Sequence, residues 1–344
     1  MKILLITLLC VMPVFATEWI IDSVTDEVKS PFGVEVGPDD ALYITEVGRH
    51  VISRLDRKTG RLSIVAGTAN EKGYAGDGGL ATEARLFEPY EVRFDTKGNM
   101  YFVEMMNHLI RKVDAEGIIS TIAGTGEKGC SGDGGTALKA TFNRPHSIAL
   151  DEKRNHLYVA DIGNNRLRRI DLVKGLIETY TGGGTKNPSE GSVENIKWNG
   201  PRALFIEGRN LWMALRGGHS VWRIDLDADT HEHIACTGDK GYTGDGGAAK
   251  AATMNGPKGI AIGPKGNIYV VDTENQAIRM IDVSTGLMHS IAGYGPTGRG
   301  YNGDGMPGLQ AKMGRPHGLC VDTTGAVYVG DTENHRIRRI RPVK

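Results

Sequence analysis

The sequence has 344 residues, with 41 basic and 41 acidic side chains, so its formal net charge is zero at pH 7. This balance excludes a general electrostatic attraction to nucleic acid or to anionic membranes. A chain of this length can bury a core large enough to fold without disulfide bonds.

Residues 1–16 have the pattern of a secretory signal peptide. Lys2 supplies the positive start, residues 3–15 are apolar apart from Thr7 and Pro13, and Ala16 ends a candidate cleavage site. The apolar run is shorter than the roughly 20 residues that a membrane-spanning helix needs. We therefore expect a signal peptide over 1–16, one mature domain over 17–344 without a membrane span, and a secreted or periplasmic location.

A repeat of about 56–59 residues then runs to the end of the chain. Each copy opens with a proline, and an aromatic residue follows about twelve positions later, as Tyr43 follows Pro31. Such a fixed period predicts an array of identical structural units. The opening prolines are Pro31, Pro89, Pro145, Pro201, Pro257 and Pro316.

Each unit is expected to contain four short antiparallel strands. In the second copy the alternation of apolar residues and the turn residues between them predict strands over 91–95, 100–104, 109–114 and 118–123. No segment shows sustained helical periodicity. Six such units predict an all-β fold, a six-bladed propeller of four-stranded antiparallel blades.

The two termini are expected to close the ring. The last copy stops after its third strand, at 337–342, and the segment 19–24 has the pattern of a strand without an earlier partner. We therefore expect the N-terminal strand to complete the sixth blade, which leaves no open sheet edge.

The repeat motifs resemble those of NHL-repeat propellers. The segments "NHLYVADIGNNRLRRID", "GNIYVVDTENQAIRMID" and "GAVYVGDTENHRIRRI" carry the resemblance, which extends from Pro31 to the C-terminus. It supports the six-bladed fold and does not specify an activity, because one fold hosts many functions. The mature cysteines Cys130, Cys236 and Cys320 lie at different places in their repeats, and their odd number predicts a free thiol or one incidental bridge.

Insertions between the blades carry a second motif, as in "GYAGDGGLATEARL" from Gly73. Alanines three apart predict one helical turn, and we expect the single aspartate of each insertion to cap neighbouring backbone N–H groups rather than to bind calcium, which needs several carboxylates at one site. The segment 182–198 lacks the motif and is the most specialised insertion. The four aspartates are Asp77, Asp133, Asp245 and Asp304.

Histidines and arginines at repeated positions are expected to connect neighbouring blades. Four histidines stand seven residues after the repeat aromatic, where the remaining copies have Asn165 and Gln276. Because they are spread around a ring, they do not form one metal site, and we expect inter-blade hydrogen bonds. The histidines are His50, His108, His219 and His335, and the arginines of the third strands include Arg111, Arg168 and Arg338.

The residue directly after each proline, by contrast, differs from copy to copy. Since the innermost strand of each blade starts at one end of the central channel, these six side chains are expected to meet at its mouth. They combine imidazoles, a phenol and cations, which suits acid–base chemistry or anion binding. In chain order they are Phe32, Tyr90, His146, Arg202, Lys258 and His317.

Further charged residues are expected beside this cluster. Glu91 follows Tyr90, and Glu35 and Arg93 are placed deeper in the channel, while blade 4 has Leu215 followed by the cation Arg216. The second-strand ends add Glu46, Glu104, Asp161, Asp272 and Asp331.

A metal site is an alternative for the two histidines of this cluster. The segments "PHSIALD" and "PHGLCVD" resemble parts of the peptide-amidating lyases, which are similar propellers that bind zinc, and the resemblance implies His146 and His317 as ligands. A third histidine at this position is missing, whereas a catalytic zinc generally has three protein ligands. A bound zinc or calcium ion is therefore an alternative for which the sequence offers only an incomplete set of ligands. The sequence also resembles gluconolactonase-type propellers, more loosely, but the carboxylate and asparagine residues that bind their metal have no equivalent in this chain.

These patterns predict an exported propeller that binds an anionic small molecule, carbohydrate or peptide at the channel mouth. Arg202, Lys258 and Arg216 would neutralise the ligand, with Arg93, Glu35 and Glu104 as further contacts. A first alternative is an enzyme. In a lyase His146, His317 or Tyr90 would move a proton of a uronate or other carboxylate, and in a hydrolase Glu91 would activate water against a lactone or peptidyl substrate. A second alternative is a non-enzymatic scaffold for an extracellular protein. In each case we expect a monomer.

Overall fold

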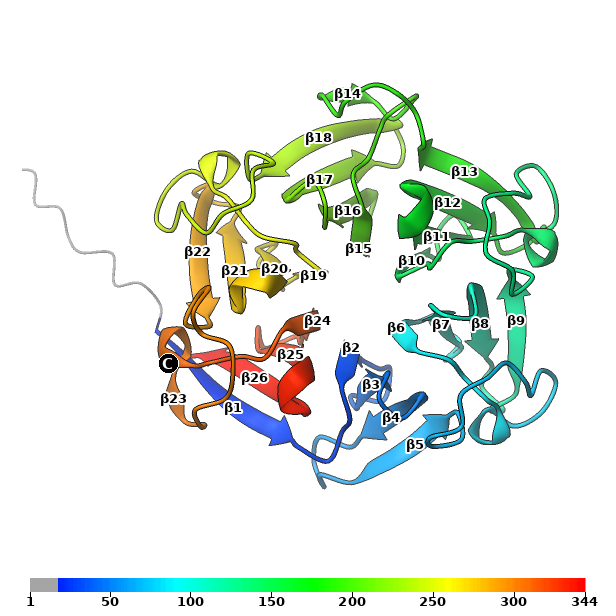
Figure 1. Ribbon diagram of the computed structural model, residues 1–344, viewed down its shortest axis with the longest axis horizontal. Coiled ribbons are helices and arrows are strands. Elements are labelled where there is room, and N and C mark those ends of the chain that lie inside the picture. The colour runs from blue at the N-terminus through cyan, green and yellow to red at the C-terminus, as the bar shows by residue number, and fades with distance from the viewer. Residues whose placement is uncertain (1–17, 344) are drawn as a thin grey trace, which may run out of the picture.

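The protein is a ring of six β-sheets around a central axis. The computed structural model describes residues 18–343, so the expected signal peptide lies outside the described residues. Figure 1 shows the six sheets as blades, with the first strand of each blade nearest the axis. The predicted six-bladed, all-β propeller is therefore confirmed.

In blades 1 to 5 the strands pair in sequence order from the inside of the ring to the outside, and in blade 6 the N-terminal strand β1 takes the outer place beside β26. Blades 1 to 3 are β2 (Pro31–Val36), β3 (Leu42–Glu46), β4 (Val51–Leu55), β5 (Leu62–Ala66); β6 (Pro89–Phe94), β7 (Met100–Glu104), β8 (Leu109–Val113), β9 (Ile119–Ala123); and β10 (Ser147–Asp151), β11 (His156–Asp161), β12 (Arg166–Asp171), β13 (Leu176–Gly182). Blades 4 to 6 are β15 (Pro201–Glu207), β16 (Asn210–Leu215), β17 (Ser220–Asp225), β18 (Thr230–Ala235); β19 (Gly259–Ile262), β20 (Ile268–Asp272), β21 (Ala277–Asp282), β22 (Leu287–Ala292); and β24 (Pro316–Val321), β25 (Val327–Asp331), β26 (Arg336–Pro342), β1 (Trp19–Thr25).

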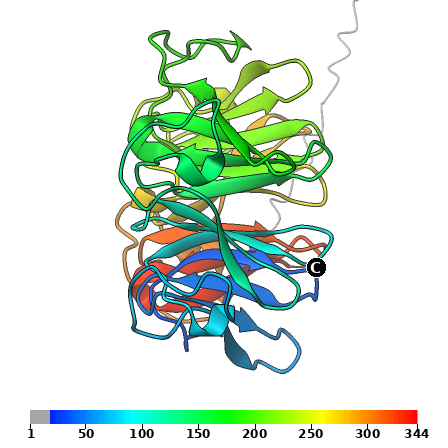
Figure 2. The same cartoon turned by 90° about the vertical axis from the view of Figure 1, so that its right-hand side faces the viewer.

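The N-terminal strand closes the ring, as predicted. β1 runs antiparallel to β26, with Trp19 opposite Pro342 and Ile21 opposite Ile340. Two short strands, β23 (Met306–Pro307) and β14 (Gly191–Ser192), extend the outer edges of blades 6 and 4. Figure 2 shows the ring from the side, with β14 and its loop projecting at one edge. Pairing the first strand with the last removes the unpaired edge that an open array would present.

The insertions contain the predicted single turns of helix. These are 3₁₀-helices, and the first residue of each is buried: Ala81, Ala137, Ala249 and Gly308. The four turns are η1 (Ala81–Glu83), η2 (Ala137–Lys139), η4 (Ala249–Ala251) and η6 (Gly308–Gln310).

A buried ion network repeats in four blades and corrects one prediction. Arg279 of β21, 1% exposed, pairs with Asp272 at the end of β20 (3.4 Å) and with Asp245 of the insertion (3.0 Å). The insertion aspartates are therefore partners of a buried arginine, and the expectation that they cap nearby backbone N–H groups was wrong. The sequence alone could not predict this arginine–aspartate pairing, because the pairing depends on how the insertion folds over the blade. The equivalent pairs join Arg111, Arg168 and Arg338 to Asp77, Asp133 and Asp304.

The predicted inter-blade hydrogen bonds are made by three of the four repeated histidines and by both residues that replace histidine at this position. His108 Nδ1 accepts from the backbone N–H of Arg144 in the next connection, at 3.0 Å. All six residues at this position have positive φ, between 45° and 59°. Equivalent bonds are made by Asn165, His219, Gln276 and His335, whereas His50 Nδ1 has no partner among residues 18–343.

Apolar side chains of neighbouring blades pack into six core clusters, one of which includes Ile52, Leu86 and Phe102. The three mature cysteines are free: Cys130 is exposed, and Cys236 and Cys320 are buried. In the described part of the chain, no helix is long and apolar enough to cross a membrane.

Candidate functional site

Bulges at the start of the innermost strands direct side chains into the channel mouth. In β15 Pro201 pairs with Leu215 and Ala203 with Ala214, so Arg202 is an extra residue without a partner. The ladders of β2, β6 and β24 shift at the same place. A bulge bends the strand and re-aims the side chain of the unpaired residue. The mouth residues are therefore set apart from the regular sheet by the backbone itself.

The structure brings all six proline-following side chains together. The Phe32 ring stacks on His317 (centroids 3.9 Å apart) and lies 4.5 Å from Tyr90. Tyr90 contacts His146 edge to face at 4.7 Å, and the Arg202 guanidinium lies 5.2 Å from the Tyr90 ring centroid. Lys258 Nζ lies 3.5 Å from His317 Nε2. These six residues, which we call the mouth cluster, form a continuous layer across the channel.

Arg202 is the cation of this cluster that forms no ion pair within the described residues. Its side chain is buried, with 3% of its surface exposed. Its Nη1 has no hydrogen-bond partner, and no carboxylate among residues 18–343 forms an ion pair with it. Burial lowers the pKa of this guanidinium, and the nearby Tyr90 and Glu91 oppose the shift. Burying a charge without a partner costs free energy, so a negatively charged group bound beside Arg202 would be stabilising.

Lys258 has a carboxylate partner that the sequence did not indicate. Its Nζ donates to Glu274 at 2.9 Å, and Arg315 donates to the same oxygen at 3.0 Å. Burial lowers the pKa of Lys258 to about 8, while hydrogen bonds from both cations hold the pKa of Glu274 at about 2 despite its burial. At pH 7 the three groups carry two positive charges and one negative charge.

The two mouth histidines are neutral bases. His146 Nδ1 lies 2.6 Å from the Arg144 carbonyl oxygen, and His317 Nδ1 lies 2.9 Å from that of Arg315. A carbonyl can only accept, so each Nδ1 carries the proton and each Nε2 is left as the acceptor. Burial, followed by the charge of Arg202 or Lys258, lowers both pKa values well below 6.5.

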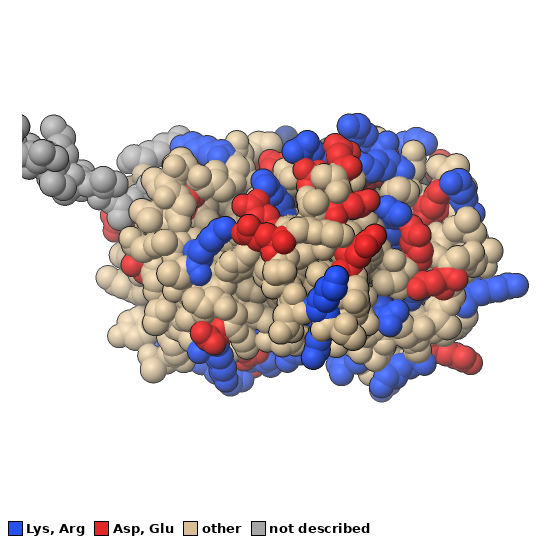
Figure 3. All heavy atoms as spheres, turned by 90° about the horizontal axis from the view of Figure 1, so that it is seen from above, with Lys and Arg blue, Asp and Glu red and all other residues tan. Residues whose placement is uncertain are grey.

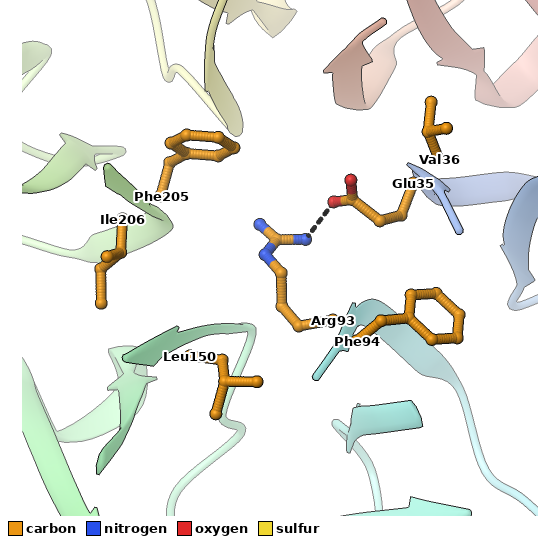
Figure 4. Close-up of a pocket in the computed structure, with 7 residues that line it drawn as sticks. All are labelled: Glu35, Val36, Arg93, Phe94, Leu150, Phe205 and Ile206. Carbon is orange, nitrogen blue, oxygen red and sulfur yellow. Dashed lines mark hydrogen bonds and ion pairs between the residues drawn. The ribbon is translucent and has the colours of Figure 1, made fainter. Parts of the chain in front are cut away.

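Below the mouth cluster an ion pair crosses the channel. Arg93 donates to Glu35 of blade 1 at 2.9 Å and to the Leu204 carbonyl of blade 4 at 3.0 Å. Figure 4 shows this pair among the residues that line a cavity of ≈ 210 Å³, together with Phe205, Leu150 and other apolar side chains. Glu91 accepts from Ser147 at 2.5 Å and from Arg93 at 3.4 Å, and burial raises the pKa of both glutamates. The channel is therefore closed beneath the mouth.

The second-strand acids do not join the mouth cluster. Glu104 is fully buried, and its carboxylate accepts from Arg111 at 2.9 Å and from Asn107. Asp161, Asp272 and Asp331 take part in the same repeated ion network. Arg216, by contrast, is exposed and lines a cavity beside the mouth. Within residues 18–343 no three His, Cys, Asp or Glu side chains are arranged to hold a metal.

Sequence reasoning missed the rim of the mouth, although a signal was present. The residue before each proline has positive φ and also differs between copies. Arg144 and Arg315 add cations there, and Glu88 adds a carboxylate whose pKa is raised by burial. In chain order the rim residues are Ser30, Glu88, Arg144, Gly200, Gly256 and Arg315. The outer wall near β14 and β18 instead shows both charges interspersed (Figure 3).

Comparison with known proteins identifies curated relatives of this propeller. "Protein SUPPRESSOR OF QUENCHING 1, chloroplastic" of Arabidopsis thaliana is 32% identical over 280 residues, covering 77% of this chain. "NHL repeat-containing protein 2" of Gallus gallus is 26% identical over 332 residues, covering 87% of this chain. The matched parts are 26% and 44% of those proteins, so the chain spans less than half the length of each.

Solved structures with the same fold come from several bacteria. An auxiliary nutrient binding protein from Bacteroides thetaiotaomicron has a TM-score of 0.67 at 16% identity, covering 95% of this chain and 77% of that one. Virginiamycin B lyase from Staphylococcus aureus has a TM-score of 0.57 at 17% identity, covering 95% of this chain and all of that one. At these identities the likeness shows the fold alone.

Two family models match the chain itself. The teneurin NHL domain model matches residues 68–130 and 225–297, and the NHL repeat model matches residues 142–170 and 313–340. The matches fall on blades 2, 3, 5 and 6 and include the motifs that end the second strands of these blades. Together with the six-bladed architecture, they show that the chain belongs to the NHL-repeat propeller family.

Proposed function

We propose that this protein binds an anionic ligand at the channel mouth. The observation that carries the proposal is Arg202, a buried guanidinium whose Nη1 has no partner among the described residues. In proteins buried charges are normally paired, and an anion can supply the missing partner. Lys258, Arg144 and Arg216 place further positive charge around the same opening, which favours the approach of an anion. A structurally similar propeller is an auxiliary nutrient binding protein, which agrees with a binding role.

The proposal is tested by measuring the binding of small anions. Acetate, inorganic phosphate and D-galacturonate are titrated calorimetrically into the wild type and into Arg202→Met. We expect at least one anion to bind the wild type, and its affinity to fall roughly 10- to 100-fold in the variant, because a charge-assisted hydrogen bond is lost. Arg209→Met is the matched control, since Arg209 is 61% exposed and pairs with Asp225 on a strand turn. Equal affinity in Arg202→Met and in the wild type would contradict the proposal.

A lyase activity is the second candidate, and the histidine tautomers favour it. The Nε2 atoms of His146 and His317 are unprotonated acceptors at pH 7, and a structurally similar propeller is virginiamycin B lyase. In such a reaction one Nε2 would take the proton on the carbon next to a bound carboxylate, and the group on the neighbouring carbon would leave as a carbon–carbon double bond forms. The test is the ultraviolet absorbance of unsaturated product from oligogalacturonides. If neither His146→Gln nor His317→Gln changes the turnover, these histidines are not the bases of the reaction.

We further propose that residues 1–16 are removed on export and that residues 17–344 form the mature domain. The intact mass of the protein recovered outside the cytoplasm of an expressing bacterium tests this. A start near Thr17 is expected, and a mass that includes Lys2 would contradict it.

A further inference from the structure

This inference rests on the proposed mouth site and concerns the place of the rest of a bound ligand. The rim of the mouth is open on one side only. The rim residues of blades 4 and 5 are Gly200 and Gly256, whereas the other four blades have side chains at this position. Both glycines have φ of 60–66°, and a Cβ on Gly256 would lie 3.1 Å from Glu274. A ligand held at Arg202 can therefore leave the mouth over blades 4 and 5.

A cavity begins at this gap. It measures ≈ 650 Å³ and is lined by the two rim glycines together with Arg216, Glu274 and Lys240. A second cavity of ≈ 710 Å³ shares Asn199 and Gly217 with the first and continues along blade 4 beneath the segment 183–198. Both volumes are in the range of small-molecule sites. Because they share lining residues, the two cavities form one groove that starts at the mouth, which we call the blade-4 groove.

Along the groove, blade 4 lacks the repeated ion network. Leu215 and Trp222 stand where blade 5 has Asp272 and Arg279, and Gly217 stands where it has Glu274. The preceding insertion lacks the Gly-Asp-Gly-Gly motif and has Trp198 near its end. The two tryptophans pack against each other with centroids 5.5 Å apart. The residues of blade 4 that depart from the repeat, and the insertion before this blade, thus lie together along one groove.

The lining of the groove suits a hydroxyl-rich ligand. Asn187 and Asp239 are exposed, and Ser220, Thr237 and Asn199 add hydroxyl and amide groups over a base of Trp198 and Trp222. Amides, hydroxyls and carboxylates together offer donors and acceptors side by side, which matches sugar hydroxyls, since each of these donates and accepts. A peptide would instead be recognised through a free strand edge or apolar pockets, and β14 already covers the outer strand β18 of this blade.

We propose that the ligand is an oligosaccharide with a terminal acidic sugar. Its carboxylate pairs with Arg202 in the mouth, and the following sugars lie in the blade-4 groove. Only a chain end can reach Arg202, because the Arg93–Glu35 pair closes the channel below. The ligand therefore enters from one direction, with the acidic residue first.

The inference is tested with saccharides of increasing length. Mono- to tetrasaccharides ending in galacturonate, glucuronate or mannuronate, their neutral counterparts and short peptides are titrated into the wild type, Asn187→Ala, Asp239→Ala and the control Asp26→Ala, whose carboxylate is 71% exposed away from the groove. In at least one acidic series the affinity should rise about tenfold or more from monomer to trimer. The two groove variants should lose most of that gain and bind the monomer as the wild type does.

The outcomes separate this inference from the mouth site. If monomeric anions bind but affinity is independent of length in all three series, the blade-4 groove is not the saccharide site and the mouth proposal stands. Stronger binding of a peptide or of a neutral saccharide would also overturn the inference. If no anion binds at all, the proposed function itself fails.

Discussion

Two kinds of buried arginine lie in the same propeller, and their surroundings differ. Arg279 is 1% exposed and reaches two carboxylates, those of Asp272 and Asp245. Arg202 is 3% exposed and has none among residues 18–343. The first belongs to a network that recurs in four blades, and the second occurs once, at the channel mouth. The comparison separates charge that holds the fold together from charge that is available to a ligand.

Removing a paired arginine should have the largest effect. Arg279→Met leaves the buried Asp272 without its partner, which is expected to lower the free energy of unfolding by about 3–5 kcal/mol. Urea unfolding followed by circular dichroism measures this loss. Arg169→Met is the control, because Arg169 pairs with Glu178 at the surface and such pairs contribute under about 1 kcal/mol. If both variants lost the same amount, the distinction between buried and surface pairs would not hold here.

Removing the unpaired arginine should have the opposite sign. In the absence of ligand, Arg202→Met replaces a buried, uncompensated cation with an apolar side chain of similar length, so the free energy of unfolding should rise by about 1–3 kcal/mol. The same unfolding experiment in an anion-free buffer measures it. A destabilisation as large as that of Arg279→Met would show that Arg202 has a structural partner.

The mouth histidines should make stability depend on pH. Their folded pKa values lie well below 6.5, whereas the unfolded chain takes up protons near 6.5. The unfolded state therefore binds more protons below that pH, and the free energy of unfolding falls on acidification by up to about 1.4 kcal/mol per pH unit for each histidine.

The double variant His146→Gln, His317→Gln tests this dependence. Its free energy of unfolding should fall less steeply than that of the wild type between pH 6.5 and 5. The other histidines titrate in both proteins, so only the difference between the two curves is informative. Parallel curves would mean that both imidazoles titrate alike in the folded and the unfolded protein, which would contradict their lowered pKa values.

The smallest effect is expected at a repeated position. His108→Asn should change the free energy of unfolding by less than about 0.5 kcal/mol, because Asn165 already fills this place in blade 3, at a φ of 52°, and accepts the same inter-blade hydrogen bond. His108→Val, which lacks the acceptor and is strained at positive φ, should lose about 1–3 kcal/mol. Thermal unfolding of both variants checks the contrast, and equal losses would remove the scaffold interpretation of these histidines.

The sequence predicts the fold and the meeting of the mouth residues well, for one physical reason. Residues at the same place in a closed repeat lie at the same height around the axis, so Tyr90, Arg202 and His317 had to converge. What a side chain pairs with is harder to predict. Glu274 and Glu333 occupy the same place in the motif Asp-Thr-Glu-Asn, yet Glu274 pairs with the mouth residue Lys258 and Glu333 pairs with the surface residue Arg299.

Glu104 illustrates the same limit. Its place at the end of a second strand suggested the mouth, but the neighbouring Arg111 and Asn107 draw its carboxylate into the ion network. The segment 182–198 was identified as specialised because it lacks the common motif. Its role in the blade-4 groove depends on Trp198 and Trp222 packing together, which only the folded chain shows.

The most direct test of the central claim combines stability with ligand. Thermal unfolding of the wild type and of Arg202→Met is measured with and without saturating D-galacturonate. We predict that the ligand raises the unfolding temperature of the wild type, since binding to the folded state alone stabilises it. We also predict that Arg202→Met unfolds at a higher temperature than the unliganded wild type and does not respond to the ligand. A variant that is less stable than the wild type and still responds fully to the anion would contradict the claim that Arg202 is kept unpaired for a ligand.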